Sequence, residues 1–423
     1  MKKIFSVLLF LSILLGAFSF ACAEELSGSY QLWISVEDWG AVVTRAILAL
    51  PGEVAQTDVE KDTFNVMVSR RDLRGNDPLK QLGTREVLNA YVSDADGNSL
   101  EKNNYITIDM KIGPNISAAS ALNYATGANV WVELQYLFCL NKPLTIGETE
   151  YKNLPELTLS GMRYDLIDRF DFGMKTYGEH TLRYAYYKPK DIYEKSPLLV
   201  WLHGGGEGGS DPTIPLAANK ATVFADDDFQ NAMGGAYVLI PQSPTFWMDS
   251  ISGNRGDGTS VYTEALMELI KDFVTDNNID EENIIVGGLS NGGYLTLVLA
   301  REYPEYFSKY VPVCEALADS LITDEDIKTY SELSMWFVAA KTDDVVVPED
   351  YTIATYERIK ALEPKDVHFS LYDNVVDKSG LYFKDGGEPY EYQGHWSWIY
   401  VYNNDMITTT NGEEVSMFEW LAK

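Results

Sequence analysis

Positively charged residues are scarce in this sequence, which has 33 Lys and Arg against 63 Asp and Glu and a formal net charge of −30. No segment gathers the basic residues into a stripe. Proteins that bind nucleic acid need clustered Lys and Arg to neutralise phosphates, so we exclude nucleic acid as a partner. The acidic excess favours solubility and disfavours anionic partners.

The sequence also lacks internal repeats, low-complexity tracts and, after its N-terminal segment, any apolar run near the ~20 residues that span a bilayer. Hydrophobic residues make up 46% of the chain, charged residues 23% and aromatic residues 13%. This composition excludes a disordered chain, a collagen and a coiled coil. A length of 423 residues predicts two or three globular domains without stable membrane insertion.

Cysteine is rare as well, with three in the chain. Cys139 lies in a run that alternates like a strand, and Cys314 follows a strand that looks buried. A free cysteine packs as a small hydrophobic residue, so we expect two separate thiols here. A disulfide between them would suit an exported protein, but nothing in the sequence suggests one.

The N-terminus carries the long apolar run of the sequence. Lys2 and Lys3 precede apolar residues up to about Phe20, and Ala21-Cys22-Ala23 follows. A charged region, an apolar region and a small-x-small site together predict a signal peptide over residues 1–23, cleaved after Ala23, and a secreted or periplasmic protein. Cys22 leaves a second interpretation open, a lipid-anchored N-terminus.

Residues 28–157 have the pattern of an all-β domain. Short runs alternate apolar and polar residues, as half-buried strands do, and turn residues separate them. About seven such strands in ~130 residues predict a β-sandwich. The expected strands include residues 30–36, 63–68, 85–92, 104–111 and 128–140.

Residues 158–423 predict a second domain of a different class. Unbroken apolar runs, typical of strands buried on both faces, alternate with segments of helical periodicity. This order predicts an α/β fold with a mostly parallel sheet flanked by helices. The expected strands are residues 181–187, 198–202, 236–240, 284–287, 335–339 and 367–372, and the expected helices are residues 263–277, 292–302 and 353–362.

The segment Gly288-Leu289-Ser290-Asn291-Gly292 is a G-x-S-x-G motif between an expected strand and an expected helix. Glycines at both ends permit a sharp turn that exposes the serine hydroxyl at the carboxyl edge of the sheet. A serine hydroxyl is a weak nucleophile, so a base must lie beside it. We therefore predict Ser290 as a nucleophile whose base lies elsewhere in the chain.

A glycine-rich run, residues 203–209, directly follows the expected strand 198–202. It lacks the G-K-[ST] ending of a phosphate-binding loop and the spacing of a dinucleotide fingerprint. Backbone amides of such a turn can instead form an oxyanion hole. We expect the amides of Gly205 or Gly206 and of Asn291 to bind the negative oxygen of a tetrahedral intermediate, although a plain surface loop is the alternative.

The chain has four histidines from which the base must come. His203 belongs to the glycine-rich run, His180 precedes the serine motif within a β segment, and His368 alternates within a strand. His395 lies in a turn after the last core strand and before the closing helix. We therefore predict His395 as the general base.

A carboxylate should orient the imidazole and stabilise its protonated form. Asp343 and Asp344 follow the expected strand 335–339, between the serine and the histidine in chain order. We predict Asp343, and Asp344 remains an alternative because its spacing to the following valines also fits. The order Ser, Asp, His is that of an α/β-hydrolase.

Three further residues are candidates for substrate binding, since ligand pockets are rich in aromatic groups. Gln242 and Trp247 follow the expected strand 236–240, and Trp396 is next to the candidate base. Plain packing in the core is the alternative role for both tryptophans.

The segments Leu202-His203-Gly204-Gly205-Gly206-Glu207, Gly288-Leu289-Ser290-Asn291-Gly292-Gly293 and Gly394-His395-Trp396 resemble signatures of the α/β-hydrolase superfamily. They are most similar to secreted esterases related to prolyl oligopeptidases, polyhydroxybutyrate depolymerases and feruloyl esterases. The resemblance implies an α/β-hydrolase fold, with Ser290, Asp343 and His395 as the catalytic triad. It also implies that the β-sandwich is an immunoglobulin-like domain of the kind some of these esterases carry. Ala339-Ala340 departs from the His-Gly of many relatives and blurs the alignment of Asp343.

These observations predict an exported serine esterase that needs no metal or cofactor. Its substrate would be a small ester or an ester linked to a polysaccharide. A serine peptidase of the prolyl oligopeptidase type is the nearest alternative, but such peptidases usually carry a propeller domain much longer than the ~130 residues in front here. A non-catalytic binding protein is the alternative from another class, and it would predict a missing nucleophile or base.

Overall fold

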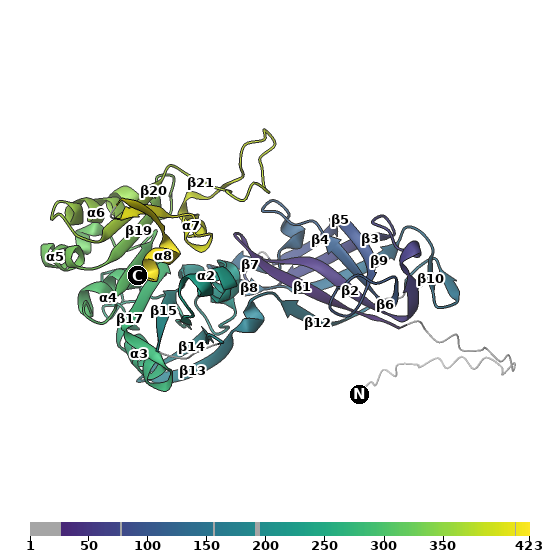
Figure 1. Ribbon diagram of the computed structural model, residues 1–423, viewed down its shortest axis with the longest axis horizontal. Coiled ribbons are helices and arrows are strands. Elements are labelled where there is room, and N and C mark those ends of the chain that lie inside the picture. The colour runs from purple at the N-terminus through teal and green to yellow at the C-terminus, as the bar shows by residue number, and fades with distance from the viewer. Residues whose placement is uncertain (1–26, 77, 155–156, 191–194, 411) are drawn as a thin grey trace, which may run out of the picture.

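The computed structural model describes residues 27–423 except residues 77, 155–156, 191–194 and 411. The predicted signal peptide and Cys22 lie outside the described residues. Two units lie side by side along the long axis of the molecule, an all-β unit and an α/β unit (Figure 1). Within the described residues, none of the helices is both long enough and apolar enough to cross a bilayer.

The all-β unit is a sandwich of a five-stranded and a three-stranded sheet, with strand orders β12-β1-β2-β6-β5 and β4-β3-β9. Alternate side chains of β3 are buried, which is the pattern of a strand with one face in a core. The rings of Tyr30 on β1 and Phe138 on β9 lie 5.2 Å apart, so the two sheets pack face to face. The strands are β1 (Ser29–Glu37), β2 (Gly40–Ala55), β3 (Phe64–Asp72), β4 (Leu79–Arg85), β5 (Val87–Ser93), β6 (Lys102–Met110), β9 (Glu133–Leu140) and β12 (Thr158–Tyr164).

The segment expected to be one strand over residues 128–140 is two strands in the structure. Strand β8 (Ala128–Trp131) pairs with β7 (Leu122–Ala125) as a separate hairpin, and β9 pairs with β3. Thr126 and Gly127 at the tip of the hairpin both have positive φ, as a tight two-residue turn requires. The hairpin lies at the junction of the two units (Figure 1).

The boundary between the units differs from the one expected at residues 157 and 158. Strand β12 pairs in parallel with β1, so it completes the five-stranded sheet of the sandwich. Sequence patterns record alternation within a strand and not its partner, so the expected second domain includes residues 158–164 although they pair with β1. We therefore propose a boundary after Tyr164, and we call residues 28–164 the front domain and residues 165–423 the α/β domain.

The α/β domain has an eight-stranded sheet with the order β13-β14-β16-β15-β17-β18-β19-β20. Pairing is antiparallel between β13, β14 and β16 and parallel from β16 to β20. The strands are β13 (Asp171–Tyr177), β14 (His180–Tyr187), β15 (Ser196–Leu202), β16 (Tyr237–Gln242), β17 (Ile279–Leu289), β18 (Lys309–Val313), β19 (Met335–Ala340) and β20 (Val367–Tyr372).

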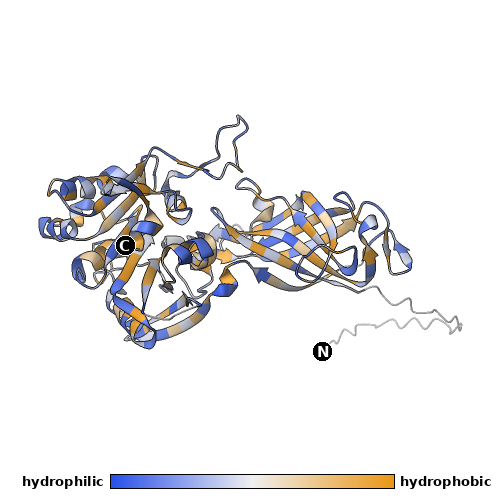
Figure 2. Ribbon diagram, in the orientation of Figure 1, coloured by the Kyte–Doolittle hydropathy of each residue, from blue (hydrophilic) through white to orange (hydrophobic). Residues whose placement is uncertain are grey.

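Helices cover both faces of this sheet, because its strands bury side chains on both sides. Leu198, Val200 and Leu202 of β15 pack into one core, and Leu199 and Trp201 pack into the other. Hydrophobic residues accordingly concentrate along the central strands (Figure 2). Helices α3 (Thr263–Asp276), α4 (Asn291–Glu302), α5 (Asp324–Glu332) and α6 (Thr352–Lys360) line the first core, and α1 (Ile214–Ala218), α2 (Asp227–Ala232), α7 (Trp398–Tyr402) and α8 (Met417–Leu421) line the second.

The second core continues into the front domain, where the same cluster of buried side chains fills the sandwich. The two remaining cysteines, Cys139 and Cys314, are separate free thiols, as the sequence predicts. Cys314 is buried directly after β18, and Cys139 is half-buried on β9.

Candidate active site

Ser290 lies in the sharp turn between β17 and α4. Its backbone has φ of 53° and ψ of −111°, which is an unusual conformation for a residue other than glycine. The Ser290 amide donates to the Val313 carbonyl at 2.8 Å, which ties the turn to the neighbouring strand. A Cβ on Gly288 would lie 2.6 Å from the Leu202 carbonyl oxygen, and one on Gly292 would overlap the same group. The two glycines of the motif are therefore required by the close passage of β15.

His395 and Asp343 come together although 52 residues separate them in the chain. His395 Nδ1 lies 2.7 Å from Asp343 Oδ2, and the two side chains are nearly buried. Asp343 Oδ1 accepts the amides of Val345 and Val346, each at 2.9 Å, so the carboxylate is fixed from both ends. Any side chain on Gly394 would overlap the backbone of Thr342, so glycine there lets the two loops meet.

The neighbouring acid, Asp344, takes a different position. Its side chain is exposed and accepts a hydrogen bond from Gln393 Nε2 at 3.1 Å. The geometry therefore favours Asp343 over Asp344 as the partner of the imidazole.

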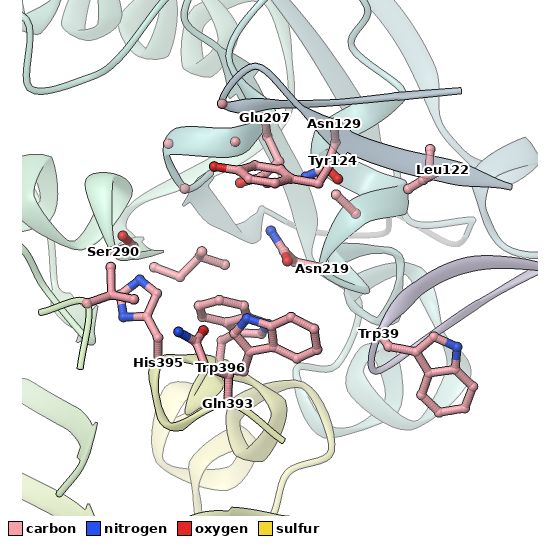
Figure 3. A pocket seen from close by; sticks show the side chains of 18 of the residues that line it. Trp39, Leu122, Tyr124, Asn129, Glu207, Asn219, Ser290, Gln393, His395 and Trp396 are labelled. Carbon is pink, nitrogen blue, oxygen red and sulfur yellow. The ribbon is translucent and has the colours of Figure 1, made fainter. Parts of the chain in front are cut away.

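Ser290 and His395 line the same cavity, which has a volume of about 650 Å³. Figure 3 shows the serine beside the imidazole at one end of this cavity. Because the Nδ1 atom of His395 is hydrogen-bonded to Asp343, Nε2 is the nitrogen that is left to accept a proton from the serine hydroxyl. The three residues predicted from separate motifs thus lie in one place.

The glycine-rich run forms a loop on the same cavity. Gly204, Gly205 and Gly206 line the cavity, and Gly205–Glu207 forms a single 3₁₀ turn, η4. Asn291, the first residue of α4, is buried, and its side chain accepts the Trp247 amide at 2.6 Å. The first amides of a helix have no partner within the helix, so the Asn291 amide is a donor at the base of the serine turn.

His203 fixes the glycine-rich loop through a hydrogen bond to its backbone. The Ser243 amide donates to His203 Nε2 at 3.1 Å, so the ring proton resides on Nδ1, which donates to the Gly204 carbonyl at 2.6 Å. Burial lowers the pKa of His203 to about 4 and keeps the ring neutral. His203 therefore fixes the loop and has no nitrogen left for proton transfer.

Of the three residues expected to bind substrate, Trp396 lines the cavity and the other two do not. Gln242 is buried and its Nε2 donates to the Glu207 carbonyl at 2.8 Å and to the Asp211 carbonyl at 2.9 Å. Trp247 is fully buried and packs on His203. Gln242, at the end of β16, and Trp247 therefore support the residues of the glycine-rich loop and do not face the cavity.

The front domain supplies a large part of the cavity wall, which the sequence did not predict. Tyr124 and Asn129 come from the β7–β8 hairpin, and Asp38 and Trp39 come from the turn between β1 and β2. Figure 3 shows Trp39 at the end away from Ser290. No motif marks these residues, because they reach the cavity only through the packing of one domain on the other. The other lining residues outside the predicted set are Ser120, Leu122, Gly127, Glu207, Ala218, Asn219, Phe246, Leu289, Val345, Gln393 and Trp398.

Two buried carboxyl groups flank the site. Burial raises the pKa of Glu207 to about 7, against the opposing effect of hydrogen bonds that include one from Asn129. Burial also raises the pKa of Glu315 to about 8, although the Leu317 amide donates to its Oε2 at 2.7 Å. Within the described part of the chain, no three His, Cys, Asp or Glu side chains are grouped so that they could hold a metal ion.

Comparison with known proteins gives a family match for a segment of each domain. Residues 29–151 match the esterase Ig-like N-terminal domain, and residues 245–373 match the prolyl oligopeptidase family. A crystal structure of a thermostable esterase superposes on the chain with a TM-score of 0.71 at 23% identity, covering 89% of this chain and 96% of that one. The α/β domain has the α/β-hydrolase fold. The predicted fold class is thus confirmed, as is the immunoglobulin-like front domain.

A curated relative extends the similarity to a named enzyme. The poly(3-hydroxyalkanoate) depolymerase C of Paucimonas lemoignei is 26% identical over 136 residues, which are 30% of this chain and 29% of that protein. The match thus spans less than a third of the relative's length. Segments of this chain are thus similar to an esterase Ig-like domain, to the prolyl oligopeptidase family and to a depolymerase.

Proposed function

We propose that the protein is a serine esterase in which Ser290 is the nucleophile, His395 the general base and Asp343 the residue that orients the base. The observation that carries this proposal is the 2.7 Å contact of His395 with Asp343, since His395 and Ser290 line the same cavity. The strained turn at Ser290 supports it, because such strain persists where the surrounding structure holds it for a purpose.

In the first half-reaction, Ser290 Oγ bonds to the ester carbonyl carbon while His395 Nε2 takes the hydroxyl proton. The π electron pair moves onto the carbonyl oxygen, which accepts hydrogen bonds from the amides of Gly205, Gly206 and Asn291. The bond to the leaving alcohol then breaks, and the alcohol oxygen takes the proton from His395. The acyl group remains on Ser290.

The second half-reaction releases the acid. A water molecule bonds to the acyl carbon while His395 takes one of its protons, and the same amides receive the oxygen. The bond between carbon and Ser290 Oγ breaks, and the proton returns to the serine. Asp343 stabilises the imidazolium that exists between the two proton transfers.

Replacing the nucleophile tests the proposal. Ser290→Ala should abolish hydrolysis of p-nitrophenyl butyrate while the thermal melt stays near that of the parent. Ser331→Ala, on α5 away from the cavity, is the matched control and should retain full turnover. Hydrolysis by Ser290→Ala at the parental rate would remove the proposal.

The prolyl oligopeptidase match leaves a peptidase as the second candidate. The front domain is a small two-sheet sandwich, which favours esters, because peptidases of that type usually filter peptides through a propeller. Parallel assays with aryl esters, poly(3-hydroxybutyrate), methyl ferulate, acetylated xylan and proline-containing fluorogenic peptides separate the candidates. Cleavage of the peptides alone would assign the peptidase function.

We also propose that the protein is exported, on the pattern of residues 1–23. The N-terminal sequence of protein recovered outside the cytoplasm should begin at Glu24. A lipid-modified Cys22 at the N-terminus would support the anchored alternative, and an uncleaved Met1 would contradict both.

A further inference from the structure

The β7–β8 hairpin of the front domain rests directly on the glycine-rich loop. Asn129 Nδ2 donates to Glu207 Oε1 at 3.0 Å, across the boundary between the domains. A Cβ on Gly206 would lie 3.0 Å from the ring of Tyr124 and 3.2 Å from Asn129 Nδ2. Figure 3 shows Tyr124, Asn129 and Glu207 together on one side of the cavity. The hairpin therefore contacts both Gly206 and the residue after it.

Glu207 depends on this contact. Its side chain is 4% exposed, and Asn129 is its strongest hydrogen-bond donor, ahead of Asn219 and the Gly204 backbone. A buried carboxyl group that loses a donor has a higher desolvation cost. Without Asn129, we expect the side chain of Glu207 to shift and to displace η4 with it.

The loop has little internal support that could resist such a shift. The hydrogen bond within η4, from the Glu207 amide to the Gly204 carbonyl, is long at 3.4 Å. Gln242 and His203 hold the loop from the α/β domain, on the side away from the cavity. The hairpin covers the other side.

The hairpin is itself anchored firmly enough to serve as a support. Trp131 Nε1 donates to Thr213 Oγ1 of the α/β domain at 2.8 Å. Arg74 of the sandwich donates to the carbonyls of Asn123 and Ala128, both at 3.2 Å. The position of Asn129 is thus fixed from both domains.

We propose that Asn129 and Tyr124 are positioning residues, which hold the oxyanion amides of Gly205 and Gly206 in place through Glu207 and the packing on Gly206. The inference rests on the proposed function, because it concerns the oxyanion hole of that reaction. Oxyanion donors act only within a few tenths of an ångström of the correct position. A displaced loop should therefore slow the chemical step and leave ground-state binding nearly unchanged.

Reversing the polarity of the hydrogen bond tests the proposal. Asn129→Asp places a carboxylate against Glu207 and should lower kcat for p-nitrophenyl butyrate by about 10- to 100-fold with KM within about twofold. Adding Glu207→Gln restores a donor and an acceptor in reversed order and should recover kcat to within about threefold of the parent. Affinity for a phenyl trifluoromethyl ketone, whose serine adduct carries an oxyanion, should fall and recover with kcat.

The control is an ion pair of the front domain that does not border the cavity. Lys142→Met removes the contacts with Glu60 at 2.8 Å and Asp62 at 2.7 Å and should leave kcat near the parental value. If Asn129→Asp does not fold, Asn129→Ser, which shortens the donor, is measured in its place. A kcat unchanged by the Asn129 substitution, or a double variant no faster than Asn129→Asp, would overturn the proposal. Ser290→Ala, run beside them, reports separately on the proposed function, since activity in that variant would point to a different nucleophile.

Discussion

At the scale of single residues, two histidines of the α/β domain differ in what their ring nitrogens contact. Both nitrogens of His203 are engaged by backbone groups of the loop and of Ser243, and burial holds its pKa near 4. His395 uses Nδ1 for Asp343 and lines the cavity beside Ser290. The environment, and not the residue type, separates a structural histidine such as His203 from His395, the base that we propose.

The position of the acid predicts unequal effects of two neighbouring substitutions. Asp343→Asn should lower kcat for an aryl ester by about 10³- to 10⁴-fold, because an amide there no longer stabilises the imidazolium or selects the tautomer. Asp344→Asn should cost less than about threefold, since its exposed side chain contacts Gln393 and not His395. Steady-state kinetics of both variants decide the assignment, and a larger loss in Asp344→Asn would reverse it.

Glu315 predicts a dependence of stability on pH. Its pKa rises from 4.5 to about 8 on folding because of burial, so between those values the unfolded chain has lost a proton that the folded protein keeps. The free energy of unfolding therefore falls as pH rises through this window.

Glu315→Gln removes the titration and keeps an amide that can serve Leu317 and Thr352. Its Tm should exceed that of the parent by a few degrees more at about pH 8.5 than at about pH 5. Melting curves at both pH values test this, and a difference in Tm that does not change with pH would contradict it.

Sequence reasoning reached the residues that belong to motifs. Chain order, flanking strands and the scarcity of histidine lead to Ser290, to His395 and to the pair Asp343 and Asp344. Only the structure shows that Asp343 is the one in contact with His395. Tyr124 and Asn129 could not be reached, because polar and aromatic residues of a hairpin are ordinary until the fold places them against Gly206. The position of Gln242 after an expected strand predicts a place in the cavity. In the structure its side chain instead donates to the carbonyls of Glu207 and Asp211.

At the scale of elements, the crossing of β15 beneath the serine turn explains the glycines of the motif. The Leu202 and His203 carbonyls pass where a side chain on Gly292 would be. Gly292→Ala should therefore displace β15 or the start of α4 and lower the free energy of unfolding by about 3 kcal/mol or more.

Gly161→Ala on β12 is the matched control, since no atom lies within 4 Å of the added methyl group. It should change the midpoint of urea unfolding little, while Gly292→Ala should lower that midpoint clearly or give insoluble protein. Equal midpoints for the two variants would contradict the steric account.

The parallel strands were the elements easiest to predict, because burial on both faces gives unbroken apolar runs such as residues 198–202. Strand pairing was not predictable in the same way. Strands β8 and β9 are divided at Val132. The alternation of residue types along the sequence continues on both sides of this position, so it does not mark the break. The parallel pairing of β12 with β1 joins segments about 130 residues apart, and nothing in either segment encodes its partner.

At the scale of the whole molecule, the cavity that Ser290 and His395 line lies between two domains that the sequence separates. The fold class of each domain and their order were predictable from periodicity. Their packing was not, because it depends on side chains such as Trp39 and Tyr124 that carry no motif. The front domain therefore contributes residues to the wall of the cavity.

The central claim is that one serine, one histidine and one aspartate from distant segments form a single reactive site. The most direct test is to react the whole protein with an alkyl fluorophosphonate and to locate the modified residue by tandem mass spectrometry of its peptides. We expect stoichiometric modification of Ser290, loss of esterase activity in proportion, and little modification in His395→Ala. Modification at another residue, or unreactive Ser290 in an active enzyme, would contradict it.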